Sequence, residues 1–213
     1  MALFPAGCQQ DAGPEIEDHR PLDDGTIVAI GDSLTEGYEV APEEAYPAEL
    51  ERKLRRQGYS YRVINAGISG ETSSGVLSRI QWTLKLKPDI VILVTGANDG
   101  LRGIDPQLTA TNIDAIVRQL KARNITVIVG GMQMVRNLGK DYTGAFARIY
   151  PAVAQKRGVI LIPFFLAGVA GNPQLNQADG IHPTAEGYRV IVANIFPYVV
   201  EALKEHQAKI KKN

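Results

Sequence analysis

A serine, an aspartate and a histidine occupy positions in this chain that suit nucleophilic catalysis. Ser33 follows the apolar run 27–30 and a glycine turn, so it lies just past the end of a predicted buried strand. His182 lies far along the chain, three residues after Asp179. A serine hydroxyl needs a base that takes its proton, and that base needs a partner that fixes its tautomer. Ser33, His182 and Asp179 are therefore candidates for the nucleophile, the base and the partner of the base.

Each of these residues also has an ordinary structural interpretation, which the local sequence leaves open. Ser33 could cap a turn or a helix, and Asp179 and His182 could be a capping aspartate and an exposed loop histidine. The other two histidines are weaker candidates. His19 lies in a polar leader and His206 in a charged C-terminal stretch, so we expect both to be solvated. His182 is thus the histidine best placed to serve as a base.

Negative charge on a tetrahedral intermediate needs hydrogen-bond donors that are placed in advance. The backbone N–H group of Ser33 is one candidate donor. Gly70 follows the second predicted strand and, because it lacks a side chain, can bring its backbone N–H group close to a ligand. Asn98 follows the third predicted strand, and its amide group can donate as well as accept. We predict that the three form an oxyanion hole, although a turn glycine and a turn asparagine are common at such positions.

The composition is typical of one soluble globular domain. The chain has 213 residues, of which 45% are hydrophobic, and its 23 Lys and Arg residues equal its 23 Asp and Glu residues. This balance gives no indication of binding to nucleic acid or to an acidic membrane surface. A single cysteine permits neither an internal disulfide nor a cysteine-based metal site, and no apolar run is long enough to span a bilayer. The chemistry considered above requires neither a metal nor a cofactor.

Five apolar strand patterns alternate with helical patterns along the chain. The strands are apolar throughout, which favours a parallel sheet covered on both faces. We therefore predict an α/β fold, a three-layer α/β/α arrangement with a five-stranded parallel sheet in the flavodoxin-like order 2-1-3-4-5. The loops that carry the candidate residues would all leave the same edge of that sheet. The predicted strands are residues 27–30, 61–65, 90–95, 125–129 and 159–163, and the predicted helices are residues 45–57, 72–86, 106–123, 142–157 and 185–204.

Four short blocks on these loops resemble the signature of the SGNH (GDSL) hydrolases. They are Gly31-Asp-Ser-Leu34, Gly70, Gly96-x-Asn98-Asp99 and Asp179-x-x-His182, and the likeness runs from about residue 26 to about residue 203. The resemblance implies that Ser33 is the nucleophile, that Gly70 and Asn98 complete the oxyanion hole, and that the last block supplies the base and its partner. Residues 65–72, 96–103 and 163–165 are similar to the bacterial thioesterase I / protease I / lysophospholipase L1 branch, often called arylesterases.

The resemblance implies a serine esterase or thioesterase that acts on a small-molecule acyl ester or thioester. Its substrates would be fatty acyl, aryl or lysophospholipid esters and acyl thioesters, cleaved through an acyl-enzyme on Ser33. The same blocks also serve carbohydrate O-acetylesterases, which are the alternative among enzymes. A different class of protein is open as well, namely a non-catalytic α/β module that binds an anion at the helix N-terminus beside Ser33. Such a module has no need of Asp179 and His182.

Apolar side chains on loops near the predicted site could hold an acyl chain, or could instead pack in the core. The candidates are Met132, Met134, Phe165 and Leu166. The loop after the fourth strand also departs from the family, because members of this branch tend to carry prolines in the loop where this chain has residues 132–139, including Val135 and Arg136. We therefore expect a less rigid loop. Activity would then rise with the length of the acyl chain only over short to medium chains.

The ends of the chain are polar. We expect residues 1–25 to be a flexible leader or linker, residues 26–205 the hydrolase domain and residues 206–213 a charged tail. Ala6-Gly7-Cys8 resembles the end of a bacterial lipoprotein signal, whose cysteine is acylated, although the charged start and most of the apolar core of such a signal are missing. We expect the protein to be periplasmic or secreted, where it could be a lipoprotein anchored at Cys8, with the cytoplasm as the alternative location.

Overall fold

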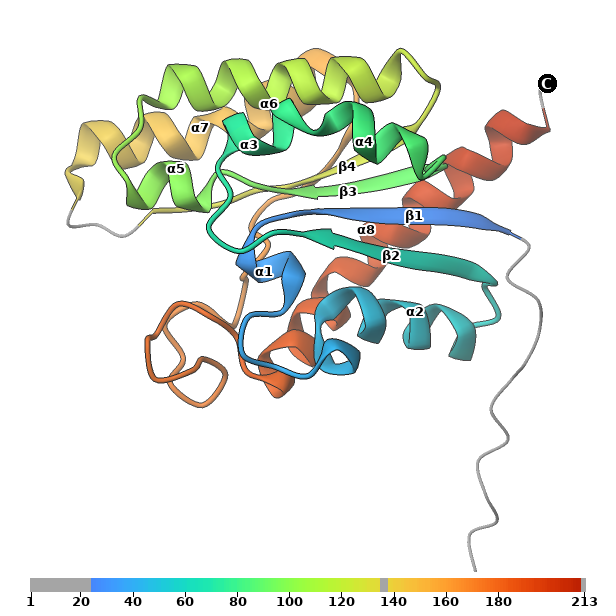
Figure 1. Cartoon of the computed structure of the whole chain (residues 1–213), viewed down its shortest axis with the longest axis horizontal. Coiled ribbons are helices and arrows are strands. Elements are labelled where there is room, and N and C mark those ends of the chain that lie inside the picture. Colours follow the sequence, from blue (N-terminus) through green and yellow to red (C-terminus); the bar gives the residue numbers. More distant parts are fainter. Residues whose placement is uncertain (1–23, 135–137, 212–213) are drawn as a thin grey trace, which may run out of the picture.

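The protein is built around a five-stranded parallel β-sheet, seen in a computed structural model that describes residues 24–134 and 138–211 (Figure 1). The strand order is β2-β1-β3-β4-β5, and every neighbouring pair is parallel. The predicted α/β fold and its 2-1-3-4-5 order are therefore confirmed. The strands are β1 (Gly25–Gly31), β2 (Tyr61–Gly67), β3 (Ile90–Val94), β4 (Thr126–Gly130) and β5 (Ile160–Ile162).

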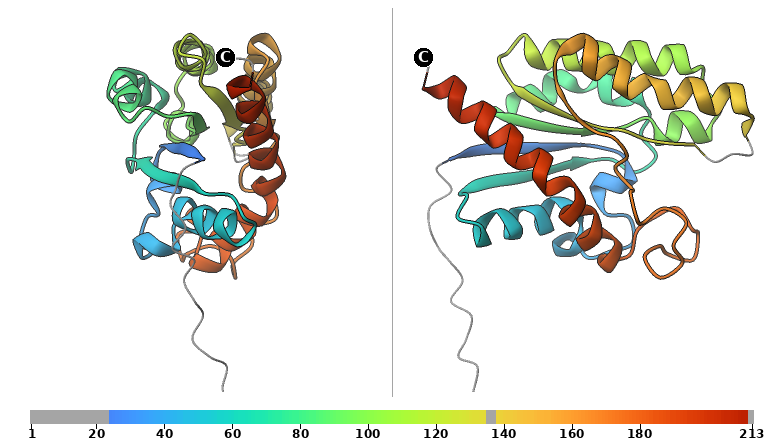
Figure 2. Two further views of the ribbon diagram at one scale, coloured as in Figure 1. Left: turned by 90° about the vertical axis from the view of Figure 1, so that its right-hand side faces the viewer. Right: turned by 180° about the vertical axis from the view of Figure 1, so that it is seen from behind.

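Helices cover both faces of this sheet (Figure 1, Figure 2). On one face lie α2 (Tyr46–Arg56) and α8 (Ala185–Ile210), and on the other lie α3 (Ser73–Ser78), α4 (Ile80–Lys85), α6 (Pro106–Lys121) and α7 (Lys140–Arg157). This division follows from right-handed crossovers, because the chain moves one way from β1 to β2 and the opposite way from β2 to β5. The short helices are α1 (Ser33–Glu36), the 3-10 helix η1 (Pro42–Glu44) and α5 (Ala97–Leu101).

The core lies on both sides of the central strands. All five residues of β3 are buried, as are the four apolar residues of β1 that precede Gly31. Helix α8 crosses the sheet diagonally in the right-hand view of Figure 2, and Ile191, Ile195 and Val199, spaced four residues apart, are fully buried on it. Continuous apolar strands between two helical layers therefore hold the ends of β1 and β3 at fixed positions.

The predicted helix over residues 72–86 is wrong in one respect, because the structure divides it into α3 and α4 at Arg79. The backbone of Arg79 has a φ of −102° and a ψ of 7°, outside α-helical values. Its guanidinium group donates to the carboxylate of Glu71 and, at 2.8 Å, to the carbonyl oxygen of Ala66 in β2. The break therefore directs a charged side chain toward the end of β2, which hydrophobic periodicity does not reveal.

The prediction of uniformly apolar, buried strands is wrong for β2. Within the described residues, β2 pairs with β1 alone and forms one edge of the sheet, and its Arg62 and Asn65 are exposed. Polar residues on an edge strand protect the sheet from pairing with other chains.

The C-terminal helix is longer than predicted. Helix α8 continues to Ile210, past the predicted end at residue 204, and contains His206, which is only 8% exposed. The His206 and Tyr61 rings lie 6.1 Å apart between centroids, and Nε2 of His206 lies 3.9 Å from Oδ1 of Asp89. The prediction of a solvated His206 is therefore wrong. The buried stripe of α8 continues into the charged segment after residue 204, which the sequence suggested was a tail.

Across residues 24–134 and 138–211, no helix is long and apolar enough to cross a membrane, and no three His, Cys, Asp or Glu residues are placed to hold a metal ion. The expectations for Cys8, His19, Val135 and Arg136 fall outside the described residues.

Candidate active site

The carboxyl ends of the strands form one edge of the sheet, on the left of Figure 1, and the predicted catalytic segments meet there. Ser33 begins α1 directly after β1, Gly70 follows β2, and Asn98 lies in α5 directly after β3. His182 lies between β5 and α8 on the long loop drawn in orange at the lower left. These loops come together because parallel strands all end at the same edge.

Ser33, His182 and Asp179 form a continuous chain of hydrogen bonds. The Oγ atom of Ser33 lies 2.8 Å from Nε2 of His182, and Nδ1 of His182 lies 2.6 Å from Oδ2 of Asp179. Ser33 is 9% exposed, and His182 is half-buried. The structure therefore brings together three residues that are separated by up to 149 positions in the chain, with each imidazole nitrogen facing one partner.

Asp179 is held as an anion by its own loop. Its Oδ1 atom accepts the backbone N–H groups of Ile181 at 2.8 Å and of His182 at 3.0 Å. The hydrogen bond from the His182 side chain, followed by these two backbone bonds, lowers the pKa of Asp179 to about 2. Gly180 permits the tight turn with a φ of +70°. The carboxylate is therefore charged at neutral pH and fixes the orientation of the imidazole.

A single helical turn presents Ser33. Asp32 caps α1 by accepting the N–H group of Leu34 at 3.0 Å, and Gly37 ends it in the left-handed conformation. A Cβ atom on Gly67 would lie 2.2 Å from the backbone nitrogen of Glu36, so a glycine is needed where β2 passes α1. The Ser33 N–H group donates to no other described residue and is available to a ligand.

Gly70 and Asn98 place further donors on the two neighbouring loops. Gly70 has a φ of +75°, a conformation that glycine adopts without strain, and its N–H group has no acceptor within the described residues. The Nδ2 atom of Asn98 uses one of its two N–H groups to donate to the carbonyl oxygen of Glu71 at 3.1 Å. Both predicted residues thus lie at the same end of the sheet as Ser33.

An ion pair that the sequence did not reveal supports Asn98. Nη2 of Arg79 lies 2.6 Å from Oε2 of Glu71, and the two side chains are only 14% and 10% exposed. The backbone carbonyl of Glu71 is the acceptor that orients the Asn98 amide. The ion pair therefore holds this acceptor in place, and the eight-residue spacing of Glu71 and Arg79 offered no signal for it.

A second buried cluster anchors the Asn98 loop. Asp99 is fully buried and accepts hydrogen bonds from the backbone N–H group of Ser73 at 2.8 Å, the Ser73 hydroxyl at 2.5 Å and the Thr109 hydroxyl at 3.2 Å. Asn112 donates in turn to the Ser73 hydroxyl at 3.0 Å. The cluster ties α5 to α3 and α6, so it fixes the loop of Asn98 relative to the segment that follows Gly70.

We expect Asp99→Ala to lower the free energy of unfolding by at least about 1–3 kcal/mol, because it leaves buried donors of Ser73 and Thr109 without an acceptor. Urea unfolding followed by circular dichroism measures this loss. Asp114→Ala is the matched control, since Asp114 forms an ion pair with Arg157 nearer the surface and should cost less. Equal losses in the two variants would show that the cluster around Asp99 is no stronger an anchor than a surface ion pair.

Asp32 is a buried carboxyl group with a perturbed pKa. It is fully buried, and its Oδ2 atom has no hydrogen-bond partner within the described part of the chain. Burial raises the pKa of Asp32 to about 6, and the N–H group of Leu34, the charge of His182 and the Asn98 amide limit the rise. Asn98 and His182 therefore both lie near Asp32.

We expect Asp32→Asn to stabilise the protein at pH 8 and to have little effect below pH 4. Between pH 3.8 and about 6 the folded state binds more protons than the unfolded state, so the free energy of unfolding of the wild type falls as pH rises. Asparagine cannot ionise and can still cap α1, so the variant avoids a loss on the order of 3 kcal/mol. Urea unfolding at both pH values measures the difference, and an equal difference at pH 4 and pH 8 would contradict it.

The side chains predicted to contact an acyl chain lie mostly in the core. Met132, Phe165 and Leu166 are 3%, 0% and 9% exposed. They take the packing role that the sequence left open, so in this structure they do not line an open groove. Met134 is half-buried and packs against Gly100, where a Cβ atom would lie 1.9 Å from its sulfur.

Other large apolar side chains are exposed beside the triad. Each lies within five residues of Ser33, Gly70, Asn98 or His182 in the sequence. They offer apolar surface at the end of the sheet where the catalytic segments meet. An apolar residue close to each of the four motif blocks was the sequence signal that could have identified them. They are Tyr38, Ile68, Leu101 and Ile181, and they are between 39% and 48% exposed.

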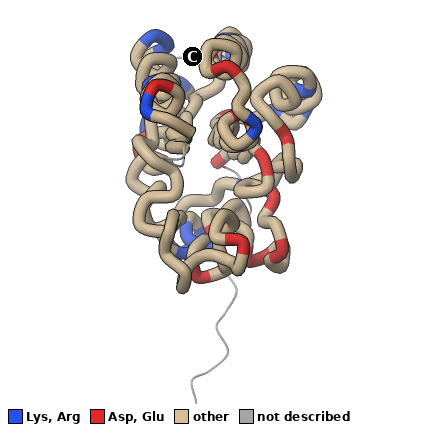
Figure 3. The backbone as a smooth tube through the Cα atoms, turned by 90° about the vertical axis from the view of Figure 1, so that its left-hand side faces the viewer, with Lys and Arg blue, Asp and Glu red and all other residues tan. Residues whose placement is uncertain are grey.

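Acidic side chains are exposed on two of the segments that meet at this end of the sheet. Figure 3 looks onto the edge, and acidic residues run along one side of it. Glu36, Glu39 and Asp179 are all exposed on the segments that carry Ser33 and His182. Negative potential at this place disfavours bound anions.

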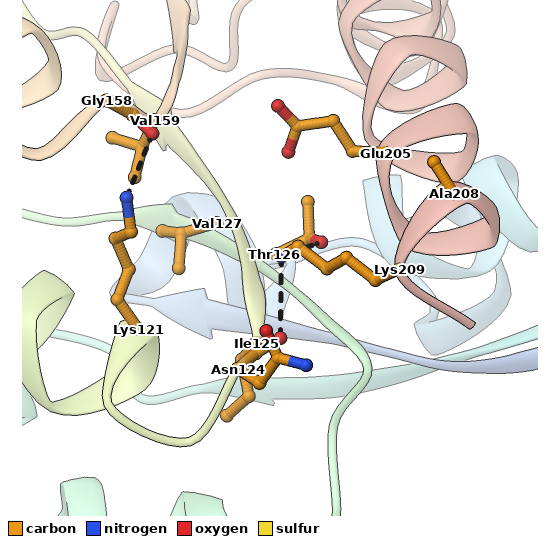
Figure 4. Close-up of a pocket in the computed structure, with 10 residues that line it drawn as sticks. All are labelled: Lys121, Asn124, Ile125, Thr126, Val127, Gly158, Val159, Glu205, Ala208 and Lys209. Atoms are coloured by element: carbon orange, nitrogen blue, oxygen red, sulfur yellow. Dashed lines mark hydrogen bonds between the residues drawn. The ribbon is translucent and has the colours of Figure 1, made fainter. Parts of the chain in front are cut away.

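The hollow drawn in Figure 4 lies at the opposite edge of the sheet, where β4 begins, and has a volume of about 410 Å³. Lys121 donates from one side to the carbonyl oxygen of Gly158 at 3.1 Å, and Lys209 donates from the other to the Thr126 hydroxyl at 2.8 Å. Burial lowers the pKa of Lys209. These bonds tie the ends of α6 and α8 to neighbouring segments, so the lysines serve the fold at a place remote from Ser33.

The chain is similar to known proteins over most of its length. A model of the GDSL-like lipase/acylhydrolase family matches residues 29–190. Esterase TesA of Pseudomonas aeruginosa is 38% identical over 173 residues, which cover 81% of this chain and 86% of the relative. Thioesterase 1/protease 1/lysophospholipase L1 of Escherichia coli strain K12 is 39% identical over 162 residues, or 76% of each chain.

The fold agrees with these matches. A crystal structure of TesA superposes on this chain with a TM-score of 0.80 at 37% sequence identity, covering 83% of this chain and 99% of the other. The matched region contains the four motif blocks, the parallel sheet and the hydrogen-bonded Ser33, His182 and Asp179. The chain therefore belongs to the GDSL-like lipase/acylhydrolase family.

Proposed function

We propose that this protein is a serine esterase that cleaves carboxylic esters and acyl thioesters through an acyl-enzyme on Ser33. His182 takes the proton of the Ser33 hydroxyl as its oxygen attacks the carbonyl carbon, and Asp179 stabilises the imidazolium that forms. The carbonyl oxygen, now negative, accepts hydrogen bonds from the N–H groups of Ser33 and Gly70 and from the Asn98 amide. His182 then protonates the leaving alcohol or thiol and, in the second half, activates the water that releases the acyl group.

The pair of short contacts made by His182 carries this proposal. Its two ring nitrogens lie 2.8 Å from the Ser33 hydroxyl and 2.6 Å from the Asp179 carboxylate. An exposed loop histidine without a catalytic role would not need both contacts. The names of the relatives, an esterase and a thioesterase 1/lysophospholipase L1, support acyl esters and thioesters as the substrate class.

The two alternatives fit the site less well. An anion-binding module is disfavoured because α1 has only four residues and the Ser33 hydroxyl is engaged by His182. A carbohydrate O-acetylesterase would use the same triad. The exposed Ile68, Leu101 and Ile181 favour an apolar acyl or aryl group over an acetylated sugar. An apolar group that covers these side chains removes apolar surface from water, which lowers the free energy of the complex.

Turnover of a substrate panel together with active-site labelling tests the proposal. We expect hydrolysis of p-nitrophenyl butyrate, p-nitrophenyl octanoate and an acyl-coenzyme A thioester, and a fluorophosphonate adduct on the peptide that contains Ser33. Preferential deacetylation of acetylated xylan would favour the O-acetylesterase. No turnover of any substrate and no adduct would overturn the proposal.

Acylation of Cys8 and location outside the cytoplasm belong to the proposal on sequence grounds, because Cys8 lies outside the described residues. The intact mass of the full chain expressed in a bacterium tests the acylation. A mass increase that corresponds to lipid and is absent from Cys8→Ser would support it. The unmodified mass in the membrane and soluble fractions would contradict it.

A further inference from the structure

Tyr38 packs its ring against the imidazole of His182. The two ring centroids lie 4.5 Å apart, with the ring planes tilted by 38°. Tyr38 is 39% exposed, so burial in the core does not explain why an aromatic residue occupies this position. We propose that Tyr38 is a positioning residue whose ring restrains the imidazole of His182 and stabilises the positive charge that the imidazole acquires. This inference rests on the function proposed above.

The backbone of Tyr38 is fixed to both halves of the site. Its N–H group donates to the carbonyl oxygen of Ser33 at 3.2 Å, and its own carbonyl oxygen accepts Nε2 of Gln177 at 2.7 Å. Gln177 belongs to the loop of His182, because its backbone N–H group donates to the His182 carbonyl oxygen at 2.8 Å and its side chain reaches the Pro183 carbonyl oxygen at 3.1 Å. Gln177 therefore fixes the backbone of Tyr38 relative to the loop of His182, which keeps the two rings in contact.

The hydrogen bonds of His182 leave one motion open that Tyr38 can restrain. Nδ1 and Nε2 each make one hydrogen-bond contact, which fixes the positions of the two nitrogens but leaves the ring free to rock about the line that joins them. An aromatic ring 4.5 Å away against one face opposes this rocking. The Tyr38 ring thereby keeps Nε2 directed at the Ser33 hydroxyl.

The same ring contributes when His182 becomes charged. As the Ser33 oxygen bonds to the carbonyl carbon, its proton moves to Nε2 of His182 and the carbonyl π electrons move onto the carbonyl oxygen. The imidazolium then lies against the electron-rich face of Tyr38, and a cation is attracted to that face. The neighbouring charge of Glu39 raises the pKa of the Tyr38 hydroxyl, so the phenol stays neutral. The ring, and not the hydroxyl, is therefore the acting group.

Tyr38→Leu and Tyr38→Phe separate the ring from the hydroxyl. We expect Tyr38→Leu to lower kcat for p-nitrophenyl butyrate by between about twofold and thirtyfold with KM unchanged, which corresponds to the range of cation–π attraction. The rate of inactivation by a fluorophosphonate should fall by a similar factor, because that reaction uses the same base. Tyr38→Phe should retain wild-type kcat. Trp82→Leu removes an exposed aromatic ring on α4, away from the site, and should change neither constant.

Each other outcome overturns the inference. A rise in KM with kcat unchanged in Tyr38→Leu would make Tyr38 a substrate contact, and equal losses of kcat in Leu and Phe variants would make the hydroxyl the acting group. A fully active Tyr38→Leu would leave the esterase proposal intact and refute only the role of Tyr38. An inactive wild-type protein would refute the esterase proposal itself.

Gln177→Ala provides a second test that leaves the aromatic ring in place. It removes the donor to the Tyr38 carbonyl oxygen, so we expect kcat to fall with KM unchanged. Gln174→Ala is the matched control, because Gln174 is exposed on the same loop and its hydrogen bond within the described residues, to Asn172, is made by its backbone N–H group and survives the substitution. Wild-type kcat in Gln177→Ala would contradict the role given to Gln177 in holding Tyr38 beside His182.

Discussion

Ser33→Ala is expected to lower kcat for p-nitrophenyl ester hydrolysis on the order of 10⁶-fold, because removal of a nucleophile eliminates the acyl-enzyme route. The thermal midpoint should change little. Among the described residues the Ser33 hydroxyl makes one hydrogen bond, to His182, and its loss costs about 0.5–1.5 kcal/mol, or a few degrees for a domain of this size. Initial rates and differential scanning calorimetry on the same preparation measure both effects.

A second serine separates this effect from a general loss of a hydroxyl group. Ser78→Ala removes a hydroxyl that donates to the Gly75 carbonyl oxygen on the exposed side of α3, and it should keep wild-type turnover. If Ser33→Ala retained turnover close to that of Ser78→Ala, Ser33 would not be the nucleophile. Folded, inactive Ser33→Ala that also resists fluorophosphonate is the expected combination.

The sheet and the hydrogen-bonded Ser33, His182 and Asp179 could be predicted because their signals lie within short stretches of sequence. Residues 27–30 and 90–94 are continuous apolar runs, and helical patterns between the strands require parallel pairing. Ser33 and Asn98 each come directly after such a run, which places them at the ligand-binding edge. Asp179 and His182 were paired by a spacing of three residues and a glycine turn.

The residues that support the site could not be predicted, because they act through contacts between distant segments. Gln177 reaches the Tyr38 carbonyl oxygen across 139 positions, and Asp99 receives the Ser73 N–H group across 26. No local pattern distinguishes such residues from ordinary polar residues of loops. Their partners become evident only when the strands have brought their loops together.

The composition of a segment did not determine whether Phe165 and His206 are buried. Phe165 is apolar and close to the site, but a sequence cannot tell whether its side chain faces the core or a groove, and it is fully buried. His206 lies among charged residues that occupy the exposed side of α8, whereas its own position continues the buried stripe after Val199 and Leu203. In both cases the packing of the fold determined whether the side chain points into the core or toward solvent.

Asn98→Ala is expected to lower kcat by about 10²–10³-fold with little change in KM, which is the usual effect of removing one oxyanion donor. Negative charge develops on the carbonyl oxygen only in the transition state, so the donor contributes little to binding the ground-state ester. Asn98→Asp should be at least as damaging, because it keeps the shape of the side chain and replaces the donor with a negative oxygen. Steady-state kinetics with p-nitrophenyl butyrate measure kcat and KM separately.

A change in the loop itself could lower kcat as well, and Asn194→Ala controls for it. Nδ2 of Asn194 donates to the Ala167 carbonyl oxygen at 2.7 Å, as Nδ2 of Asn98 donates to Glu71 at 3.1 Å, so both variants lose one bond from a side-chain amide to the backbone. Asn194→Ala should keep wild-type kcat. If Asn98→Ala raises KM while kcat holds, Asn98 positions the ground-state substrate. If kcat falls equally in both variants, the loss comes from backbone anchoring, and the oxyanion must then be stabilised by the N–H groups of Ser33 and Gly70 alone.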